Sequence, residues 1–411
     1  MTENEFTKIL QWPGYRVYRH EIDESGKRLR LWVRRKRGNR QLVCSGCGRK
    51  FKDYHDVSER EVRDLPWSSL HTTVVVEVYR VKCPDCGVKV ERVPLLPSKA
   101  PFSERFEEAV GQACESASAR QVARRLGLPE STVRAIDLRY LERWAAKRVM
   151  PNMRHIGVDE IYLGKKQKFI TVVSNLETAE PLWFGRERKK ETLDGYFETE
   201  VTSEEREGIE AACVDMWEPF TKSILQWCPQ CLIVFDKFHV MQHANAAVDE
   251  VRRAEFFRKS ETLRQVVKGK RWLLLTRWVN LDGQRRQMLN ELFKLNRRVM
   301  KAYLLKESLD RLWSYTYVGA AQRYLNQWID QLKWQRLKPM ENLAKMLLRH
   351  QEGLLNYCKA KVRMGVVEAV NGNIKAILRR GRGYRNLRYL LLKAQHMAAS
   401  RTEFMVLQNA A

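Results

Sequence analysis

The chain has 411 residues, and its 75 Lys and Arg exceed its 49 Asp and Glu, so the formal net charge is +26 with histidine neutral. Hydrophobic residues make up 44% of the chain, which excludes a disordered polyelectrolyte. A membrane-spanning helix needs about 20 apolar residues, and the longest apolar runs, such as Val74–Val76 and Trp272–Leu275, are far shorter. The N-terminal residues resemble no signal peptide, so we expect a cytoplasmic protein with no membrane partner.

The large positive charge favours a polyanionic partner. Neutralising the phosphates of a nucleic acid releases counterions, and this release supplies most of the non-specific affinity. A protein that is merely basic is the alternative. Charge therefore predicts nucleic-acid binding.

The first 100 residues have the alternating pattern of half-buried strands, for example in Leu29–Val33 and Thr73–Val81. Two C-x-x-C pairs, each followed by glycine, lie within this segment. Four thiolates on two such turns can close a tetrahedral structural zinc site, although four ordinary thiols are the alternative. We predict a zinc ribbon in which Zn²⁺ is bound by Cys44, Cys47, Cys83 and Cys86. A third pair, Cys228 and Cys231, has no partner pair and is interpreted as turn and core residues.

Residues 118–139 have the pattern of a helix-turn-helix. Ser118 and Gln121 form a capping box that starts one helix, and Gly127 provides the turn. A generic helical hairpin is the alternative, but it needs no glycine there. The second helix would present three polar residues to a major groove of DNA, namely Ser131, Arg134 and Arg139.

Residues 155–240 contain short apolar runs that end in acidic residues, which is typical of an α/β sheet. Asp159, Asp215 and Asp236 each follow such a run. Turn aspartates of no catalytic role are the alternative, and the pattern leaves open whether Asp215 or Asp236 acts in a site. His239 is a candidate to position a phosphate or a carboxylate near Asp236, or else a packed histidine.

Residues 241–355 are predicted to be helical and are rich in Arg, Leu and Trp. Five tryptophans in this part of the chain are expected mainly in helix cores, with stacking on flipped bases as the alternative: Trp272, Trp278, Trp313, Trp328 and Trp334.

A last helix, 366–380, is predicted to have an apolar face and an opposite polar stripe, since residues are about 100° apart. The apolar face would contain Val366, Val370, Ile374 and Ile377, and the stripe Glu368, Asn371, Lys375 and Arg379. An acid in line with an amide and two cations could hold metal and phosphate together, although an exposed face has the same pattern. The candidate DNA contacts are Asn371, Lys375, Arg379 and Arg382.

Two aspartates on strands and one glutamate on a helix fit a site for divalent ions. Two such ions, about 3.5–4 Å apart, can flank a scissile phosphate. Mg²⁺ takes few protein carboxylates and leaves positions for water and phosphate oxygens.

The order of these motifs resembles the ISL-three family of bacterial insertion-sequence transposases, which belong to the DDE superfamily. The resemblance runs from about Cys44 to Tyr389 and depends on the zinc ribbon, the helix-turn-helix and four short motifs. These are Gly-Val-Asp159-Glu, Val-Asp215-Met-Trp, Phe-Asp236-Lys-Phe-His239-Val and Val-Glu368-Ala-Val-Asn-Gly-Asn-Ile-Lys375. The run Arg-Gly-Tyr-Arg-Asn at 382–386 is also specific.

The resemblance implies that Asp159, Asp215 and Glu368 are the catalytic, metal-binding triad, with Mg²⁺ or Mn²⁺ as cofactor, and that Asp236 and His239 have at most a supporting role. The family motif at the glutamate usually reads Glu-Gly-x-Asn-Asn-x-Ile-Lys. Here Ala369 and Gly372 replace the glycine and the second asparagine, which leaves the carboxylate in place but puts in doubt a DNA or supporting contact that the family motif implies.

The expected fold class is a multidomain α+β protein whose RNase H-like catalytic core is interrupted by helices. Residues 1–100 would form a zinc-ribbon DNA-binding domain and 101–150 the helix-turn-helix. The core would comprise 151–240 and the C-terminal helix and basic tail in 356–411, separated by a helical insertion at 241–355.

By the same resemblance, the protein would be a transposase that binds the terminal inverted repeats of an insertion sequence. It would cleave and join double-stranded DNA at the element ends and the target, as a homo-oligomer associated with the bacterial nucleoid. Two alternatives stay open: a domesticated, catalytically silent DNA-binding regulator, and an RNase H-like structure-specific nuclease.

Overall fold

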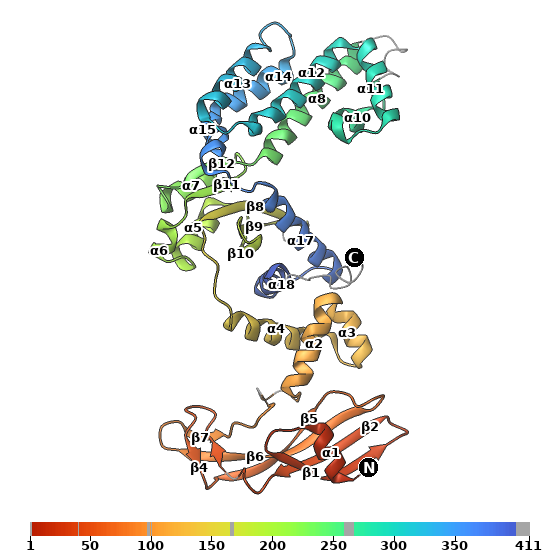
Figure 1. Cartoon of the computed structure of the whole chain (residues 1–411), viewed down its shortest axis with the longest axis vertical. Helices are drawn as coiled ribbons and strands as arrows, with labels where there is room; N and C mark the ends of the chain where they lie inside the picture. The colour runs from red at the N-terminus through yellow and green to blue at the C-terminus, as the bar shows by residue number, and fades with distance from the viewer. Residues whose placement is uncertain are drawn as a thin grey trace, which may run out of the picture. The chain divides into compact units, whose positions relative to one another are not determined.

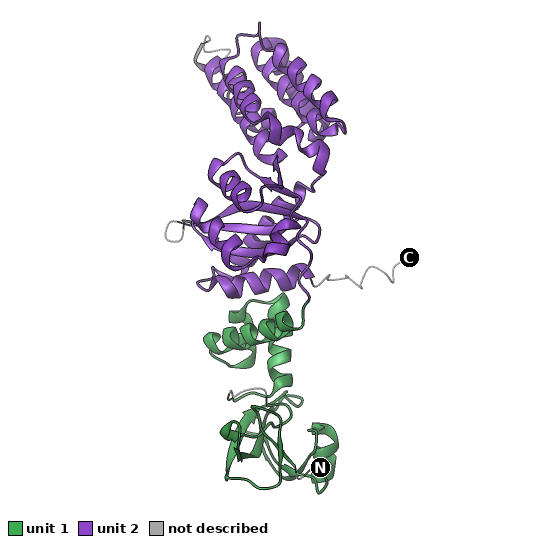
Figure 2. Cartoon of the chain, turned by 90° about the vertical axis from the view of Figure 1, so that its left-hand side faces the viewer, with its two compact units in different colours: residues 1–148 green, residues 149–411 purple. Residues whose placement is uncertain are grey.

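The computed structural model describes residues 2–39, 41–96, 99, 101–164, 168–258 and 267–399. The chain forms two compact units, residues 1–148 and 149–411 (Figure 2). No helix in the described part of the chain is long and apolar enough to cross a membrane.

The first unit begins with a five-stranded sheet of order β1-β2-β6-β5, in which β7 also pairs with β6. The strands are β1 (Tyr15–Asp23), β2 (Arg28–Arg35), β5 (Asp56–Arg63), β6 (His71–Cys83) and β7 (Gly87–Val90). Alternation in β2 buries Leu29, Leu31 and Val33 and leaves Arg28, Arg30 and Arg34 exposed. The buried face packs against α1 (Glu3–Leu10), which contributes Phe6 and Leu10 to the same core.

A second, two-stranded sheet pairs β3 (Leu42–Val43) with β4 (Lys50–Phe51). Cys44 and Cys47 lie in the turn between these two strands, and Cys83 and Cys86 lie where β6 turns into β7. Cys44 also forms a bridge with Glu91, directly after β7, so the two turns come together.

The rest of the first unit is a bundle of α2 (Glu104–Ser116), α3 (Ala119–Leu126) and α4 (Glu130–Ala146). Ser118 caps α3 with the expected capping box, and Gly127 ends it in the left-handed conformation (φ 62°) that glycine adopts without strain. The helices enclose a core that includes Phe106, Val122 and Ile136.

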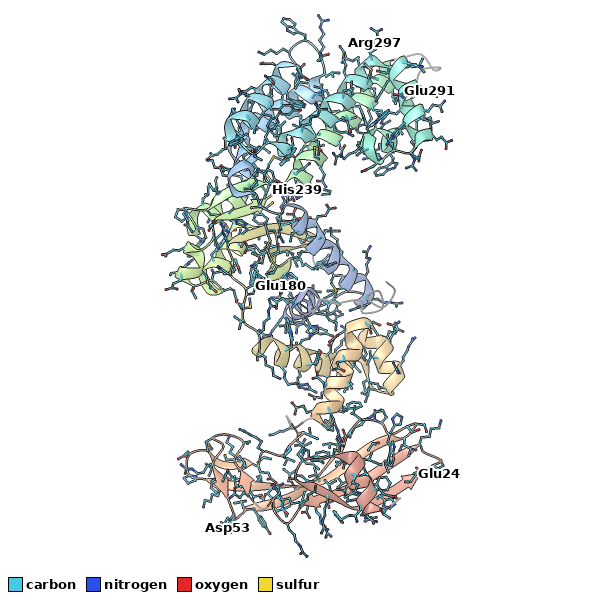
Figure 3. All side chains as sticks on the ribbon, in the orientation of Figure 1. Glu24, Asp53, Glu180, His239, Glu291 and Arg297 are labelled. Carbon is cyan, nitrogen blue, oxygen red and sulfur yellow. The ribbon has the colours of Figure 1, made fainter. Side chains whose placement is uncertain are left out.

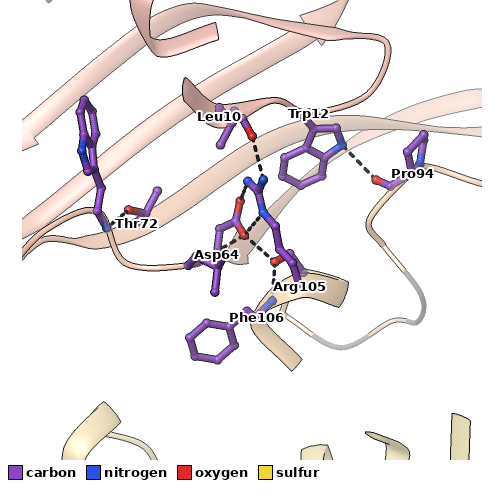
Figure 4. A network of polar contacts seen from close by, with 10 residues as sticks. Leu10, Trp12, Asp64, Thr72, Pro94, Arg105 and Phe106 are labelled. Carbon is purple, nitrogen blue, oxygen red and sulfur yellow. Dashed lines mark hydrogen bonds and ion pairs between the residues drawn. The ribbon is translucent and has the colours of Figure 1, made fainter. Parts of the chain in front are cut away.

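A buried carboxylate joins the start of α2 to the sheet. Asp64, which is 1% exposed, accepts hydrogen bonds from Ser103 Oγ (2.6 Å) and Arg105 Nε (2.7 Å). Arg105 also donates to the Leu10 carbonyl at 2.7 Å (Figure 4). The arginine therefore connects three segments of the first unit.

The second unit contains a mixed five-stranded sheet of order β10-β9-β8-β11-β12. The strands are β8 (His155–Gly164), β9 (Lys168–Asn175), β10 (Glu180–Arg186), β11 (Ala211–Val214) and β12 (Leu232–Phe235). β9 pairs antiparallel with both β8 and β10, whereas β11 runs parallel to both β8 and β12. All four residues of β11 are buried, because helices cover both faces of the sheet.

The helices on one face are α5 (Lys190–Thr199) and α7 (Glu218–Trp227), and α6 (Ser203–Glu207) lies between them in the chain. On the other face, α17 (Gly365–Gly381) packs Val367 against Cys213 and Val234 of the sheet. A last helix, α18 (Leu387–Ala399), lies against β10 (Figure 1). The side chain of Gln395 donates there to the Pro181 carbonyl at 3.0 Å. This arrangement agrees with the expected RNase H-like core.

Helices separate β12 from α17 in the chain, as the sequence predicts. They are α8 (Lys237–Arg258), α10 (Arg271–Leu275), η1 (Trp278–Asn280), α11 (Gly283–Leu295), α12 (Arg297–Leu309), η2 (Asp310–Ser314), α13 (Val318–Asp330), α14 (Lys338–Arg349), α15 (Gln351–Leu355) and α16 (Tyr357–Ala360). The long α8 begins directly after β12 and packs along α12 and α14. Among the tryptophans of these helices, Trp328 of α13 is buried and donates to the Leu305 carbonyl at 2.9 Å, whereas Trp272 and Trp334 are exposed.

Candidate active site

Three aspartates lie level with one another on three neighbouring parallel strands: Asp215 and Asp236 directly follow β11 and β12, and Asp159 lies in the middle of the longer β8. Val214 of β11 is level with Val158 of β8 and with Phe235 of β12, so the residues that follow are also level: Asp159, Asp215 and Asp236. The carboxyl edge of such strands is where α/β sheets commonly bind ligands. The first turn of α17 brings Glu368 toward the same edge, where it borders a cavity together with Asp236.

Asp159 has two side-chain partners from helices that are distant in the chain. Asn371 of α17 donates through Nδ2 to Asp159 Oδ2 at 2.6 Å, and His239 Nε2 of α8 lies 3.6 Å from Oδ1. Burial opposes the charged imidazole, but the hydrogen bond to Asp159 and the charges of Asp159 and Asp236 together raise the pKa of His239 to about 9. His239 is therefore a cation at neutral pH, at the point where α8 leaves the sheet (Figure 3).

Asp215 is held by Arg188, from the segment between β10 and α5. The guanidinium donates to Asp215 Oδ2 at 2.6 Å and lies 2.9 Å from a carboxylate oxygen of Glu160. It also stacks 4.5 Å from the centre of the exposed Trp217 ring, whose backbone N–H donates to Asp215 Oδ1 at 2.7 Å. Arg188 thus joins two carboxylates that the chain places on different strands.

Glu160 belongs to this group of charges although it follows Asp159 directly on β8. Burial raises the pKa of Glu160 to about 7; the charges of Asp159 and Asp215 add to the shift, and Arg188 opposes it. Its carboxyl therefore exchanges a proton near neutral pH.

Asp236 is 4% exposed and accepts a hydrogen bond from the backbone N–H of Phe238 at 2.9 Å. Burial raises its pKa, the Phe238 N–H and His239 lower it, and the charges of Asp159 and Glu368 raise it again. Asp236 is therefore close enough to Asp159 and Glu368 for their negative charges to raise its pKa.

The donor set fits hard divalent ions. Carboxylate oxygens are the ligands that Mg²⁺ and Mn²⁺ prefer, and burial of Asp236 among like charges leaves negative charge that a cation would stabilise. In the described part of the chain, however, only the four cysteines of the first unit have ligand atoms all within 4.8 Å of one another. The oxygens of the three triad carboxylates do not meet that limit, and Asp215 is bonded to Arg188 and Asp159 to Asn371.

The placement of Asn371 corrects the expected polar stripe of the last helix. Asn371 is buried and bonded to Asp159, so its side chain is not available as a DNA contact. The buried face includes Val367 instead of Val366 and is therefore rotated toward Asn371. The other three candidate contacts, Lys375, Arg379 and Arg382, are exposed.

In the helix-turn-helix, the three expected DNA contacts differ in exposure and in whether another residue of the chain already binds them. Ser131 is exposed at the start of α4, and Arg134 forms an ion pair with Glu130 at 2.7 Å on the same helix. Arg139 is instead bound to the fully buried Glu107 of α2, at 2.5 Å. Because that pair holds α2 and α4 together, we withdraw Arg139 as a groove contact.

The four cysteines predicted to bind zinc converge in the first unit. Their sulfur atoms all lie within 4.8 Å of one another, and Cys47 and Cys83 are 3.5 Å apart. Backbone N–H groups of Cys47 and Gly46 lower the pKa of Cys44 to about 7, which favours the thiolate that a metal binds. The C-x-x-C pair at Cys228 and Cys231 is buried in the second unit, as a turn at the core.

Arg188 is the residue at the site that the sequence reasoning missed. It lies in a run of charged residues, Arg186–Lys190, and nothing in that run distinguishes it from its neighbours. Asn371 was recognised but given the wrong partner. Its spacing of four from Val367 and three from Ile374 was a usable signal of burial.

Models of three protein families match the chain in succession. A zinc finger of the transposases IS204/IS1001/IS1096/IS1165 matches residues 40–86, and the helix-turn-helix domain of transposase family ISL3 matches 91–141. The transposase (DDE) model of the ISL3 family matches 156–394, which is more than half of the chain. The chain belongs to the ISL3 family of DDE transposases. This transposase therefore has the zinc ribbon, the helix-turn-helix and the polynucleotidyl transferase domain that its sequence predicts.

Similar proteins include transposases of two insertion sequences. The transposase for insertion sequence element IS1001 of Bordetella parapertussis is 30% identical over 387 residues, covering 93% of this chain and 95% of the relative. The transposase for IS1557 of Mycobacterium tuberculosis is 26% identical over 403 residues, covering 91% and 90%. Among solved structures, the Drosophila P element transposase strand transfer complex aligns with 74% of this chain and 94% of that chain. The two chains are 9% identical, with a TM-score of 0.37.

Proposed function

We propose that this ISL3 transposase binds the terminal inverted repeats of its element, and cleaves and joins DNA with two divalent ions held by Asp159, Asp215 and Glu368. The observation that supports this most is the convergence of β8, β11 and α17, each with one of these carboxylates, at one edge of the RNase H-like sheet. Bound Mg²⁺ or Mn²⁺ would activate the attacking oxygen and stabilise the leaving oxygen of the scissile phosphate.

The neighbouring side chains would orient these ligands and the DNA. Asn371 fixes one oxygen of Asp159, and His239 places a positive charge 3.6 Å from the other. Arg188 keeps Asp215 and Glu160 together by offsetting their charges. Asp236 would support the ligands from its buried position and not bind an ion itself.

DNA would contact both units of the chain. Ser131 and Arg134 would face the terminal repeat, with the ribbon stabilised by one Zn²⁺ on the four cysteines, and Lys375, Arg379 and Arg382 would contact phosphates beside the carboxylates. Two element ends require at least two protomers. We retain the domain boundaries 1–100, 101–150, 151–240, 241–355 and 356–411 as part of this proposal.

Excision and integration from a donor plasmid with the gene and its flanking DNA test this function. Products should appear with wild type and disappear with Asp159→Ala and with Glu368→Gln, and purified protein should require Mg²⁺ or Mn²⁺ for cleavage. Glu352→Gln is the matched control, because Glu352 is an exposed glutamate on α15. It should behave as wild type.

Other outcomes would favour the alternatives. Specific binding of the flanking DNA without cleavage by wild type would indicate a silent regulator. Metal-dependent cleavage that never yields joined products would indicate a nuclease.

A further inference from the structure

Both carboxylate oxygens of Asp215 accept a hydrogen bond. The backbone N–H of Trp217 donates to Oδ1 at 2.7 Å, and the guanidinium of Arg188 donates to Oδ2 at 2.6 Å. The first donor is neutral, whereas the second places a full positive charge against a carboxylate that the proposed function assigns to a divalent ion. Like charges at such distances repel strongly. Arg188 therefore lies where it opposes the binding of that ion.

The contact made by Arg188 differs from that of a structural arginine in the same chain. Arg105 donates through two of its nitrogens to both oxygens of Asp64, and bidentate pairs of this kind are the strong ones. Arg188 instead approaches one oxygen of Asp215 and one of Glu160. Its own Nε and Glu160 Oε2 are buried without a hydrogen bond among the described residues. Because unpaired buried polar atoms cost free energy, Arg188 can leave this arrangement more easily than Arg105 can leave its own.

The free protein needs a cation at this position. Five acidic side chains lie at the site: Asp159, Glu160, Asp215, Asp236 and Glu368. In the described part of the chain, the cations that form ion pairs with them are Arg188 and His239. Carboxylates that share a site repel unless a positive charge is near. Without a metal ion, Arg188 supplies part of the charge that a divalent ion would supply.

A second position for the guanidinium exists beside Asp215. A cavity of about 190 Å³ is lined there by Arg188, Trp217, His239 and His243, together with Asp215 and Met216. The guanidinium already stacks 4.5 Å from the centre of the Trp217 ring, which is 40% exposed. A cation can move across an aromatic face and keep its attraction to the ring. Apart from Asp215, the lining contains no acid, so the cavity suits a phosphate of a bound DNA strand.

We propose that Arg188 competes with a divalent ion for Asp215 while no DNA is bound, and that it turns to a DNA phosphate in this cavity once DNA is in place. The inference rests on the proposed function, in which Asp215 is a metal ligand and DNA is the substrate. Its consequence is that the binding of DNA and the binding of metal strengthen each other by the same factor. The free protein would then hold metal weakly, which limits cleavage to bound DNA.

Binding of Mn²⁺ to the zinc-loaded protein without DNA tests the competition. The loss of the electron paramagnetic resonance signal of free Mn²⁺ measures binding directly and requires no cleavage. Arg188→Gln should bind Mn²⁺ about ten-fold more tightly than wild type, a usual size of effect for residues beside metal ligands. Arg188→Lys keeps the charge and should bind as wild type does. The matched control is Arg186→Gln, since Arg186 is an exposed arginine two residues earlier in the same run.

The same titration with DNA tests the second position of Arg188. The probe is a terminal-repeat duplex already cleaved at the element end, so that it is not cut again. With this duplex bound, wild type should bind Mn²⁺ as tightly as Arg188→Gln, because the arginine pairs with a phosphate instead of Asp215. A ten-fold difference that persists on DNA would overturn the inference.

The outcomes separate this inference from the proposed function. Asp215→Asn identifies the ions bound at the site, and if it leaves Mn²⁺ binding unchanged with DNA present, the proposed function fails. If Asp215 binds Mn²⁺ but Arg188→Gln binds it no more tightly than wild type, only the Arg188 inference fails. Damage to the fold lowers affinity for the ion, so it does not imitate the expected gain.

Discussion

Asn371 and Arg188 show how single residues organise a site that is rich in like charges. Asp159, Glu160, Asp215 and Asp236 lie near one another, and without partners their carboxylates would repel. Asn371 offers a neutral donor to Asp159, whereas Arg188 offers a positive charge to both Asp215 and Glu160. The two residues therefore affect the ligands differently: one orients a carboxylate, and the other offsets charge.

Replacement of Asn371 by Ala tests the orienting role. Asp159 would keep its charge but lose the donor that fixes Oδ2, and such partners of metal ligands typically contribute about 10–100-fold in metal affinity or activity. The measurement is strand cleavage as a function of Mg²⁺ concentration, where the half-maximal concentration should rise. The matched control is Asn373→Ala, since Asn373 is exposed on the same helix. Equal Mg²⁺ curves for both variants would rule out an orienting role for Asn371.

At the scale of elements, side chains at the ends of helices and strands join neighbouring segments. Asp64, just after β5, is bonded to Ser103 and Arg105 at the start of α2. Glu107, within α2, is bonded to Arg139 of α4. These are buried or half-buried pairs, whose loss is costly, unlike ion pairs at the surface.

Asp64→Ala should weaken the attachment of α2 to the sheet. Breaking a buried pair by removing one partner costs about 3 kcal/mol at the lower end of the usual range, which applies here because Arg105 keeps some access to water. Hydrogen exchange of residues 101–116 in the full chain, under increasing denaturant, measures the loss. Asp56→Ala is the control, because Asp56 pairs with Arg80 at the surface. It should change that exchange much less.

The zinc ribbon is an element whose own core is small. Beside the cysteines, Leu42 and Val81 are its buried apolar residues, with Phe51 and Tyr79 packed against them. A core of this size does not hold a fold without a cross-link or a metal.

Removal of Zn²⁺ by a chelator, or Cys47→Ser, should therefore unfold the ribbon locally. Metal analysis of the untreated protein should find about one Zn²⁺ per chain. Amide exchange should then increase in residues 42–51 and 83–90, while residues 104–146 serve as the internal control and stay protected. Unchanged exchange in the ribbon after complete loss of metal would disprove a structural role for zinc.

For the whole molecule, the two units have separate cores and, in the proposal, separate contacts with DNA. The net charge of +26 predicts strong dependence on salt, because each phosphate contact contributes about 0.9 to the slope of log affinity against log salt concentration. Because the proposed contacts lie on different units, mutations in one unit should change binding near the cleavage site without changing recognition of the terminal repeat.

Simultaneous replacement of Lys375, Arg379 and Arg382 by Ala should reduce that slope by about 2.7, if each cation meets one phosphate. Preference for the terminal repeat over unrelated DNA should be kept, since the helix-turn-helix is unaltered. Fluorescence anisotropy at several salt concentrations measures both quantities. Lys222→Ala, an exposed lysine on α7, is the control. Loss of the sequence preference in the triple variant would contradict the division of roles.

Local patterns in the chain were sufficient for much of this picture. The C-x-x-C spacing, the capping box with Gly127, and the apolar runs before Asp159 and Asp215 each involve neighbours in sequence, and such signals survive without knowledge of the fold. They led to the zinc ribbon, the helix-turn-helix and an α/β sheet followed by helices, and the resemblance of the motifs led to the helical insertion and the transposase family. The domain boundaries and the roles of the triad stay predictions.

Contacts between distant segments could not be read in this way. Asn371 reaches Asp159 across 212 positions, and Arg188 reaches Asp215 across 27. The cavity beside Glu368 forms only where α8 and the residues around α10 and α12 meet α17. Packing decides which polar side chain of a helix is buried and which arginine of a charged run finds a carboxylate. Those outcomes depend on shape and charge in three dimensions, whereas periodicity records only which residues share a face.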